Sequence, residues 1–397
     1  MTSAVAFNPL TPDYQQNPYD YYRTMRQESP VYYIEPLNLW ALFRYDDVIT
    51  TVKRPDLFSS KDWIANTLGE FDVVPEVPSL ISMDPPDHTR LRKLANKAFL
   101  PGVIRKMEDG IRRLISELLD EVQDKDEFDF VNDFAAHVPV NVTAQILGAD
   151  PEIARNEFKR WTMDLLQAPN RTVLPQEDLD RIRTSVNELR AYFTDLIAYR
   201  RKNPSNDLVS ALVEAEEDRQ ALTSDEILSL VFLLQFGGSE TPSHLISSAL
   251  YECFQNPEAL AAVKSDPAAT AKVIDEAFRH MSPVHFLSRT TTQDIEMHGI
   301  TIPANSIVLS YIGSANRDET IFDDPDKFDI NRQGVSKHLA LGLGTHYCIG
   351  ALLGKMMCGT ALGAALERMP NLRPVHDTVE WMPSWWVRGL AKYPVRP

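Results

Sequence analysis

The sequence is poor in cysteine, which excludes a fold held together by disulfides. Its 397 residues include three cysteines, Cys253, Cys348 and Cys358. Their number is odd and no two of them stand in a CxxC pair, so no disulfide framework is predicted. Few and unpaired cysteines are typical of a reducing compartment, and we expect a cytoplasmic protein.

Long apolar runs and an excess of basic residues are also lacking. The longest apolar run, ILSLVFLLQFGG from Ile227, is too short to span a bilayer. The N-terminus has neither the basic region nor the apolar core of a signal peptide. The formal net charge is -16, whereas nucleic-acid-binding proteins usually carry a basic excess. We therefore expect no membrane anchor, no nucleic-acid partner and a monomeric chain.

The composition that is present is that of a globular protein. Hydrophobic residues make up 44% of the chain and charged residues 24%, enough for a core that encloses a bulky ligand. No change in composition marks a linker, so one domain is predicted over residues 1–397. It would comprise a β-rich part at about 1–80, a helical core at about 84–283, and strands with a cysteine loop at about 284–397.

Periodicity predicts a mainly α fold with a minor β part. An alternating, aromatic-rich run at 31–45 predicts a hairpin, and residues 61–80, which show no clear period, a loop. One helix is predicted to begin at residue 84, and others at 110–123, 152–167, 177–201, 224–255 and 257–263. A further helix is predicted to end at Pro283, and another to begin at Cys348. Thr223 and Glu226 have the spacing of a capping box. Strands are expected within 286–313 and 380–395.

The stretch HLALGLGTHYCIG at 338–350 places Cys348 among glycines at the start of an apolar helix. The first turn of a helix stabilises a thiolate through its backbone N–H groups and the positive end of the dipole. Gly342 and Gly344 permit tight backbone geometry and close approach to a flat object, and Gly350 removes a side chain. These features suit a sulfur that ligates a large planar cofactor.

Two alternatives compete for the cysteines. A lone cysteine in a helix is usually a buried core residue, and Cys253 and Cys358 are expected to be of this kind. A zinc site with His346 and Cys348 would need a second pair of ligands at metal-binding spacing, and the sequence offers none.

The cysteine loop resembles the haem-ligand loop of the cytochrome P450 family, whose pattern is FGxGxHxCxG. Gly342, Gly344, His346, Cys348 and Gly350 match it, whereas Leu341 stands where the family usually has Phe. The resemblance implies the cytochrome P450 fold, with haem b between the central long helix and the cysteine loop. It makes Cys348 the proximal iron ligand and puts Gly342 and Gly344 against the cofactor.

The stretch FGGSETPSH is similar to the (A/G)GxxT segment of the family's central helix. Two glycines followed by Pro242 should disturb the hydrogen-bond ladder of a helix. By the resemblance, Gly238 lies over the haem, Thr241 donates a hydrogen bond at the dioxygen site and Glu240 relays protons. The competing interpretation is a helix C-cap, because GG followed by TP is a common stop signal.

Two further groups of residues match the family in chain order. Glu276 and Arg279 of DEAFR resemble its ExxR pair, which Arg332 would complete as a structural triad. Haem propionates need cationic partners, and the resemblance assigns four residues to them, His88, Arg92, Arg289 and His346. Each of these residues, taken singly, could instead be an ordinary solvated charge.

The resemblance implies a monooxygenase that uses O2 to hydroxylate or epoxidise a lipophilic molecule such as a fatty acid, terpenoid, steroid or polyketide. No flavin or iron–sulfur module is recognisable, so electrons from NAD(P)H would arrive through a ferredoxin or flavodoxin with its reductase. We expect this partner on a basic face with Arg92, Lys93, Lys97 and Lys355. The positions expected to face the substrate are the 61–80 segment, Leu234, Gly237, Val284, His285, Phe286, Leu287, Ser384, Trp385 and Trp386.

Two other functions remain open at this point. One is a haem-thiolate enzyme that uses peroxide or rearranges its substrate. The other is a non-catalytic haem-binding protein. Neither would need the acid–alcohol pair Glu240–Thr241.

Overall fold

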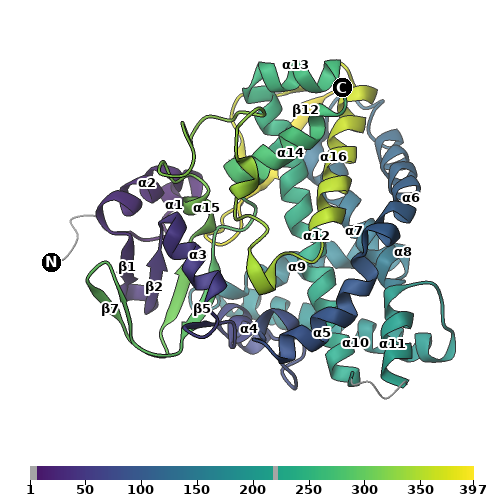
Figure 1. Ribbon diagram of the computed structural model, residues 1–397. Helices are drawn as coiled ribbons and strands as arrows, with labels where there is room; N and C mark the ends of the chain where they lie inside the picture. Colours follow the sequence, from purple (N-terminus) through teal and green to yellow (C-terminus); the bar gives the residue numbers. More distant parts are fainter. Residues whose placement is uncertain (1–6, 218–221) are drawn as a thin grey trace. The chain divides into compact units, whose positions relative to one another are not determined.

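A computed structural model describes residues 7–217 and 222–397, and helices dominate it (Figure 1). The chain divides into two compact units. Unit 1 comprises Met1–Ser59, Glu108–Val138 and Thr241–Pro397, and unit 2 comprises Ser60–Met107 and Pro139–Glu240. Among the described residues, no helix has the length and apolar content needed to cross a membrane.

The elements confirm a mainly α chain with a minor β part. The helices are α1 (Pro12–Gln16), α2 (Tyr19–Glu28), α3 (Tyr45–Lys53), α4 (Trp63–Leu68), α5 (Asp87–Ala95), α6 (Pro101–Asp120), α7 (His137–Leu147), α8 (Pro151–Ile153), α9 (Lys159–Leu165), α10 (Gln176–Lys202), α11 (Leu208–Glu217), α12 (Ser224–Gln255), α13 (Pro257–Ser265), α14 (Ala269–His280), α15 (Ile312–Ala315) and α16 (Ala351–Arg368). The strands are β1 (Val31–Ile34), β2 (Leu39–Leu42), β3 (Phe58–Ser59), β4 (Phe128–Asp129), β5 (Leu287–Thr291), β6 (Ile295–Met297), β7 (Ile300–Ile302), β8 (Ile307–Ser310), β9 (Arg373–Pro374), β10 (Glu380–Trp381), β11 (Leu390–Lys392) and β12 (Pro394–Arg396).

The main sheet of unit 1 has the strand order β1-β2-β8-β5-β3. The predicted hairpin is confirmed, since β1 and β2 pair antiparallel with Val31 opposite Leu42. β2 then pairs parallel with β8, which brings residues some 270 positions apart into one sheet, as with Trp40 and Val308. Apolar side chains of this sheet and of β6 and β7 pack into one core cluster, which fixes the strand register.

The helices of unit 1 include α14 and α16, which lie side by side (Figure 1). Helix α14 ends at His280, before the predicted stop at Pro283, because Met281 already leaves the helical conformation. Helix α16 begins at Ala351, so Cys348 lies just before its first turn. Together α14 and the N-terminus of α16 give unit 1 a helical layer next to the cysteine loop.

Unit 2 is built around α9, α10 and the first part of α12. Aromatic rings of Phe158, Trp161, Tyr192 and Phe193 contact one another with centroid distances between 5.3 and 5.9 Å. The predicted helix at 152–167 is present, but a π-helical turn at Ala154–Phe158 interrupts it. This core holds the N-terminal part of α12 in place.

Helix α12 is continuous from Ser224 to Gln255, so the C-cap interpretation of its GG–TP segment is wrong. Its start confirms the capping box. The Thr223 N–H donates to the Glu226 carboxylate at 2.9 Å, and the Glu226 N–H donates to the Thr223 hydroxyl at 3.2 Å.

The prediction of a loop over residues 61–80 is wrong in part, because Trp63–Leu68 form the short helix α4. Its buried positions are Trp63, Ile64, Thr67 and Leu68, which is a helical repeat. A threonine at one of these buried positions hides the repeat in the sequence.

Candidate active site

The cysteine loop is closed by its own backbone. The Cys348 N–H donates to the Leu341 carbonyl at 2.8 Å, and the Gly342 N–H donates to the Leu339 carbonyl at 2.8 Å. Gly342 and Gly344 both have φ of +68°, a region that side-chain-bearing residues rarely adopt. A Cβ on Gly342 would also lie 3.3 Å from the carbonyl oxygen of His346. The loop therefore needs glycine at these two positions.

The three cysteines differ sharply in exposure. Cys253 and Cys358 are 0% exposed, and burial raises the pKa of both thiols, that of Cys253 to about 12. Cys348 is exposed instead, directly before the N-terminus of α16, where helix N–H groups favour a thiolate. The buried-core interpretation thus applies to Cys253 and Cys358 but not to Cys348.

One residue that the sequence did not reveal ties the cysteine loop to α14. The Asn316 side-chain oxygen accepts a hydrogen bond from the Leu339 N–H at 2.6 Å, and its side-chain amide donates to the Ser282 hydroxyl at 2.8 Å. Its backbone oxygen accepts from Arg279 at 3.0 Å. Asn316 therefore links the start of the loop to the ion-pair cluster described next. No local pattern marks such a role.

Glu276, Arg279 and Arg332 form a buried cluster. Arg279 donates to both Glu276 oxygens at 2.9 and 2.6 Å, and Arg332 Nε donates to one of them at 3.0 Å. Glu276 and Arg279 are 0% exposed. Because a buried carboxylate between two guanidiniums has all its charge compensated, the cluster can stabilise the unit. Its geometry matches the predicted triad.

One backbone hydrogen bond of the regular α-helical pattern is missing in α12. Pro242 has no N–H, so it cannot donate to the Gly238 carbonyl four residues earlier. The Thr143 hydroxyl, from α7 in unit 2, donates to that carbonyl instead at 3.3 Å. A Cβ on Gly238 would lie 2.9 Å from the Thr143 hydroxyl oxygen. Thr143 was missed because the proline signals an unsatisfied carbonyl but not its donor.

Glu240 and Thr241 follow Gly238 on α12. Glu240 is 5% exposed, and burial raises the pKa of its carboxyl to about 7, an effect that Lys159 opposes. The side chain can therefore gain or lose a proton near neutral pH. Thr241 is half-buried and adjacent in sequence. Their joint function in proton delivery remains a prediction.

The four residues predicted to bind propionates lie in different units. His88 and Arg92 are on α5 in unit 2. His88 is buried, and burial together with Arg92 lowers its pKa. Arg289 is buried on β5 in unit 1, and His346 lies in the turn Gly344–His346. Their common function remains a prediction.

The structure brings together two of the segments predicted to face substrate. Val284 pairs antiparallel with Val387, and the His285 N–H donates to the Trp386 carbonyl at 2.8 Å. The rings of Phe286 and Trp385 lie 4.8 Å apart. Leu287 begins β5 beside them, whereas Leu234 and Gly237 are on α12 in unit 2.

His285 has a structural partner. Its Nδ1 lies 2.6 Å from the Tyr22 hydroxyl, which lies 2.7 Å from the Tyr14 hydroxyl. Burial lowers the pKa of His285 well below its usual value, so the ring is neutral. This chain of hydrogen bonds satisfies Nδ1, whereas Nε2 is buried and has no hydrogen-bond partner among the described residues.

A planar thiolate-ligated cofactor suits these residues. In unit 1, the exposed Cys348 thiol stands in a loop that needs glycine at positions 342 and 344. A family model described as Cytochrome P450 matches residues 5–267 and 268–388. The chain belongs to the cytochrome P450 family.

Relatives of this P450 cover nearly its whole length. A steroid C26-monooxygenase of Mycobacterium tuberculosis is 35% identical over 376 residues, 94% of this chain and 92% of that protein. The solved structure of the cytochrome P450 CYP109Q5 from Chondromyces apiculatus is 35% identical with a TM-score of 0.88, and covers 98% of this chain and 97% of that one. P450BioI, solved with an acyl carrier protein that bears hexadec-9Z-enoic acid, is 30% identical with a TM-score of 0.89, over 98% and 100% of the two chains. This P450 is thus a haem-dependent monooxygenase.

Proposed function

We propose that this P450 hydroxylates or epoxidises a lipophilic small molecule with electrons from a separate ferredoxin or flavodoxin and its reductase. Cys348 would hold the haem iron, and haem b, when bound, supplies the activation of O2. The exposed thiol in the glycine loop carries this proposal. His88, Arg92, Arg289 and His346 would hold the propionates.

Glu240 and Thr241 would deliver protons to the dioxygen site. A carboxyl whose pKa is about 7 holds a proton in part of the molecules at neutral pH and can be reprotonated after each release. The Thr241 hydroxyl would orient that proton by donating one hydrogen bond and accepting another. The open space at Gly237, one helical turn before Thr241 on α12, supports this proposal.

The substrate is proposed to be a long lipophilic molecule such as a fatty acid or steroid, with terpenoids and polyketides as further classes. The steroid monooxygenase and the fatty-acyl complex among the relatives support this range. The paired segments at 284–287 and 385–387 would supply apolar contacts. Shifts of the haem spin state on addition of each class would rank them.

The electron-transfer partner is proposed to dock on basic side chains. In unit 2, Lys93 is exposed on α5 and Lys97 is exposed in the turn Asn96–Phe99 that follows it. Lys355, on α16 in unit 1, forms an ion pair with Asp275 at 2.7 Å, so much of its charge is compensated. Lys93 and Lys97 should therefore contribute more than Lys355. The proposed compartment is the cytoplasm, given the few cysteines.

The deciding experiment replaces the proposed ligand. The wild-type protein, reduced under carbon monoxide, should show the Soret band diagnostic of thiolate ligation, and Cys348→Ser should lose it. The control Cys253→Ala should keep the band, because that thiol is buried elsewhere in unit 1. An unchanged spectrum in Cys348→Ser would overturn the assignment of the ligand and with it the proposed function.

A further inference from the structure

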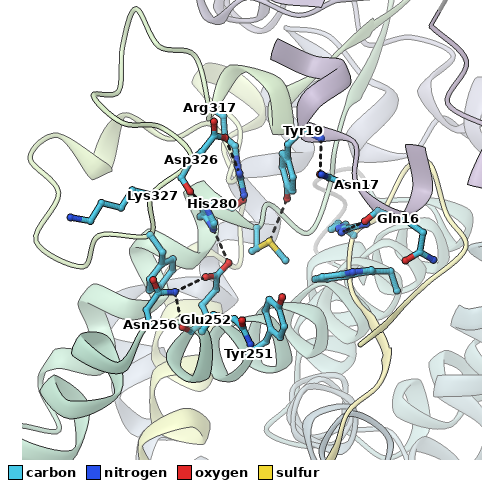
Figure 2. A pocket seen from close by; sticks show the side chains of 15 residues that line it. Gln16, Asn17, Tyr19, Tyr251, Glu252, Asn256, His280, Arg317, Asp326 and Lys327 are labelled. Atoms are coloured by element: carbon cyan, nitrogen blue, oxygen red, sulfur yellow. Dashed lines mark hydrogen bonds and ion pairs between the residues drawn. The ribbon is translucent and has the colours of Figure 1, made fainter. Parts of the chain in front are cut away.

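A cavity in unit 1 is lined by none of the residues assigned to haem or substrate. Its volume is about 490 Å³, within the roughly 300–1,000 Å³ of typical small-molecule sites. It is lined by the segment before α2, the C-terminal ends of α12 and α14, a loop at 317–328, Trp381 and Arg388. Figure 2 shows Tyr19, Tyr251, His280 and Arg317 converging on it from these elements.

Arg388 is a buried cation whose charge is uncompensated. It is 6% exposed, and its two terminal nitrogens donate to the carbonyls of Gln15 and Gln16 at 2.5 and 2.8 Å. Its Nε has no hydrogen-bond partner among residues 7–217 and 222–397, and in the same residues no carboxylate forms an ion pair with it. A guanidinium stays protonated even when buried, so this charge persists.

The carboxylates that line the cavity are already engaged. Asp326 pairs with Arg23 at 2.5 Å and with Arg317 at 3.0 Å. Glu252 accepts from Asn256 at 3.1 Å and lies 2.7 Å from His280 Nδ1. His280 Nε2 lies 3.0 Å from the Asp326 carbonyl oxygen, so the His280 ring bridges Glu252 and the backbone at Asp326. Neither acid can neutralise Arg388.

The surroundings of Arg388 favour an anion with an organic body. Its guanidinium stacks on the Trp381 ring at 3.7 Å, and the guanidinium of Arg317 stacks on Tyr19 at 3.5 Å. Such stacking fixes the plane of the Arg388 group, whose Nε is buried and has no acceptor among the described residues, and a carboxylate oxygen would supply that acceptor. Amide side chains of Gln16, Asn17, Gln255 and Asn256 complete a polar rim.

We propose that this cavity is a binding site for a small organic carboxylate, held by the Nε edge of Arg388 between the aromatic rings of Tyr19, Tyr251 and Trp381. The ligand would join the N-terminal segment to the ends of α12 and α14. The inference rests on unit 1 alone and does not depend on the proposed substrate or redox partner.

The test uses the haem-loaded protein and titration calorimetry with benzoate, hexanoate and inorganic phosphate as probes. Saturable binding of benzoate or hexanoate is expected. Gln255→Glu places a carboxylate on the exposed rim and should weaken that binding at least tenfold, whereas Gln333→Glu, the same change outside the cavity, should leave it unchanged. Arg388→Gln should abolish it.

Several results would overturn the proposal. These are no saturable binding of either carboxylate, equal binding by wild type and Gln255→Glu, or tighter binding of phosphate than of both carboxylates. The Gln255→Glu variant decides the matter even if Arg388→Gln fails to fold, because Gln255 is exposed at the end of α12. If benzoate perturbed the Soret band with the affinity measured by calorimetry, benzoate would be binding at the haem instead. That result would also refute the proposed site.

Discussion

Two buried glutamates show at the residue scale how surroundings decide chemistry. Glu276 lies between two guanidiniums and serves as a fixed negative charge. Glu240 is 5% exposed, and burial raises the pKa of its carboxyl to about 7. The sequence identified both residues by motif spacing. It could not predict their difference, because the charges and burial around each come from distant segments.

Replacing Glu240 with Gln should change the pH dependence of stability. The unfolded chain releases this proton near pH 4.5, whereas the folded protein holds it to about pH 7. Stability is therefore lost as pH rises through this window, by up to ~3 kcal/mol. Urea unfolding of Glu240→Gln should show no such pH-dependent loss. The free energy of unfolding of the variant should therefore rise relative to that of wild type between pH 5 and pH 8. Parallel profiles for the two proteins would contradict the burial argument, and exposed Glu258→Gln is the matched control.

Replacing Thr241 with Ala should uncouple electron use from product formation. Without the hydroxyl, proton delivery is misdirected while reduction continues, so product per NAD(P)H consumed should fall severalfold. Thr360→Ala is a suitable control, because that hydroxyl already bonds the Met356 carbonyl of its own helix at 2.8 Å. If coupling in Thr241→Ala equals that of wild type, the proton-delivery assignment is wrong.

At the scale of elements, α12 shows what a local pattern can predict. The capping box and the apolar repeat correctly predicted a helix from residue 224 to 255. The GG–TP segment left two interpretations open, because whether a helix survives a proline depends on what satisfies the freed carbonyl. Here the donor is Thr143, 95 residues away, and no neighbouring residue could reveal it.

The two adjacent glycines of α12 should respond oppositely to Ala. In Gly237→Ala the new Cβ has open space, so higher helix propensity should raise the free energy of unfolding by up to ~1 kcal/mol. In Gly238→Ala the Cβ meets the Thr143 hydroxyl at 2.9 Å, and overpacking should lower stability by about 1–3 kcal/mol. Chemical denaturation of both variants measures this. Equal effects of the same sign would show that the contact with Thr143 does not govern this turn.

At the scale of the whole molecule, the sequence predicted the class of fold but not its sheet. Helix content and the hairpin at 31–42 follow from local periodicity. The order β1-β2-β8-β5-β3 joins strands from both ends of the chain, and short strands carry no signal of such pairing. Family motifs supplied the site residues, whereas no local pattern indicated Asn316 or the cavity at Arg388. The assignment of 1–397 to a single domain stays a prediction.

The net charge of -16 bears on how the whole protein would meet the proposed electron carrier, which we take to be acidic. Overall repulsion must be offset by local basic side chains, so Lys93→Glu with Lys97→Glu should slow reductase-driven turnover by about tenfold or more at low salt. Turnover driven by peroxide should not change, since it needs no partner. Little loss of reductase-driven turnover would show that the surface at Lys93 and Lys97 is not the docking surface. Lys355→Glu should have a smaller effect, given its pairing with Asp275.

The link through Asn316 has a consequence for biogenesis. Residues 276, 279, 316 and 332, which together position the backbone at Leu339, all precede Cys348 in the chain. The anchor of the ligand loop therefore requires no residue that the ribosome adds after the thiol.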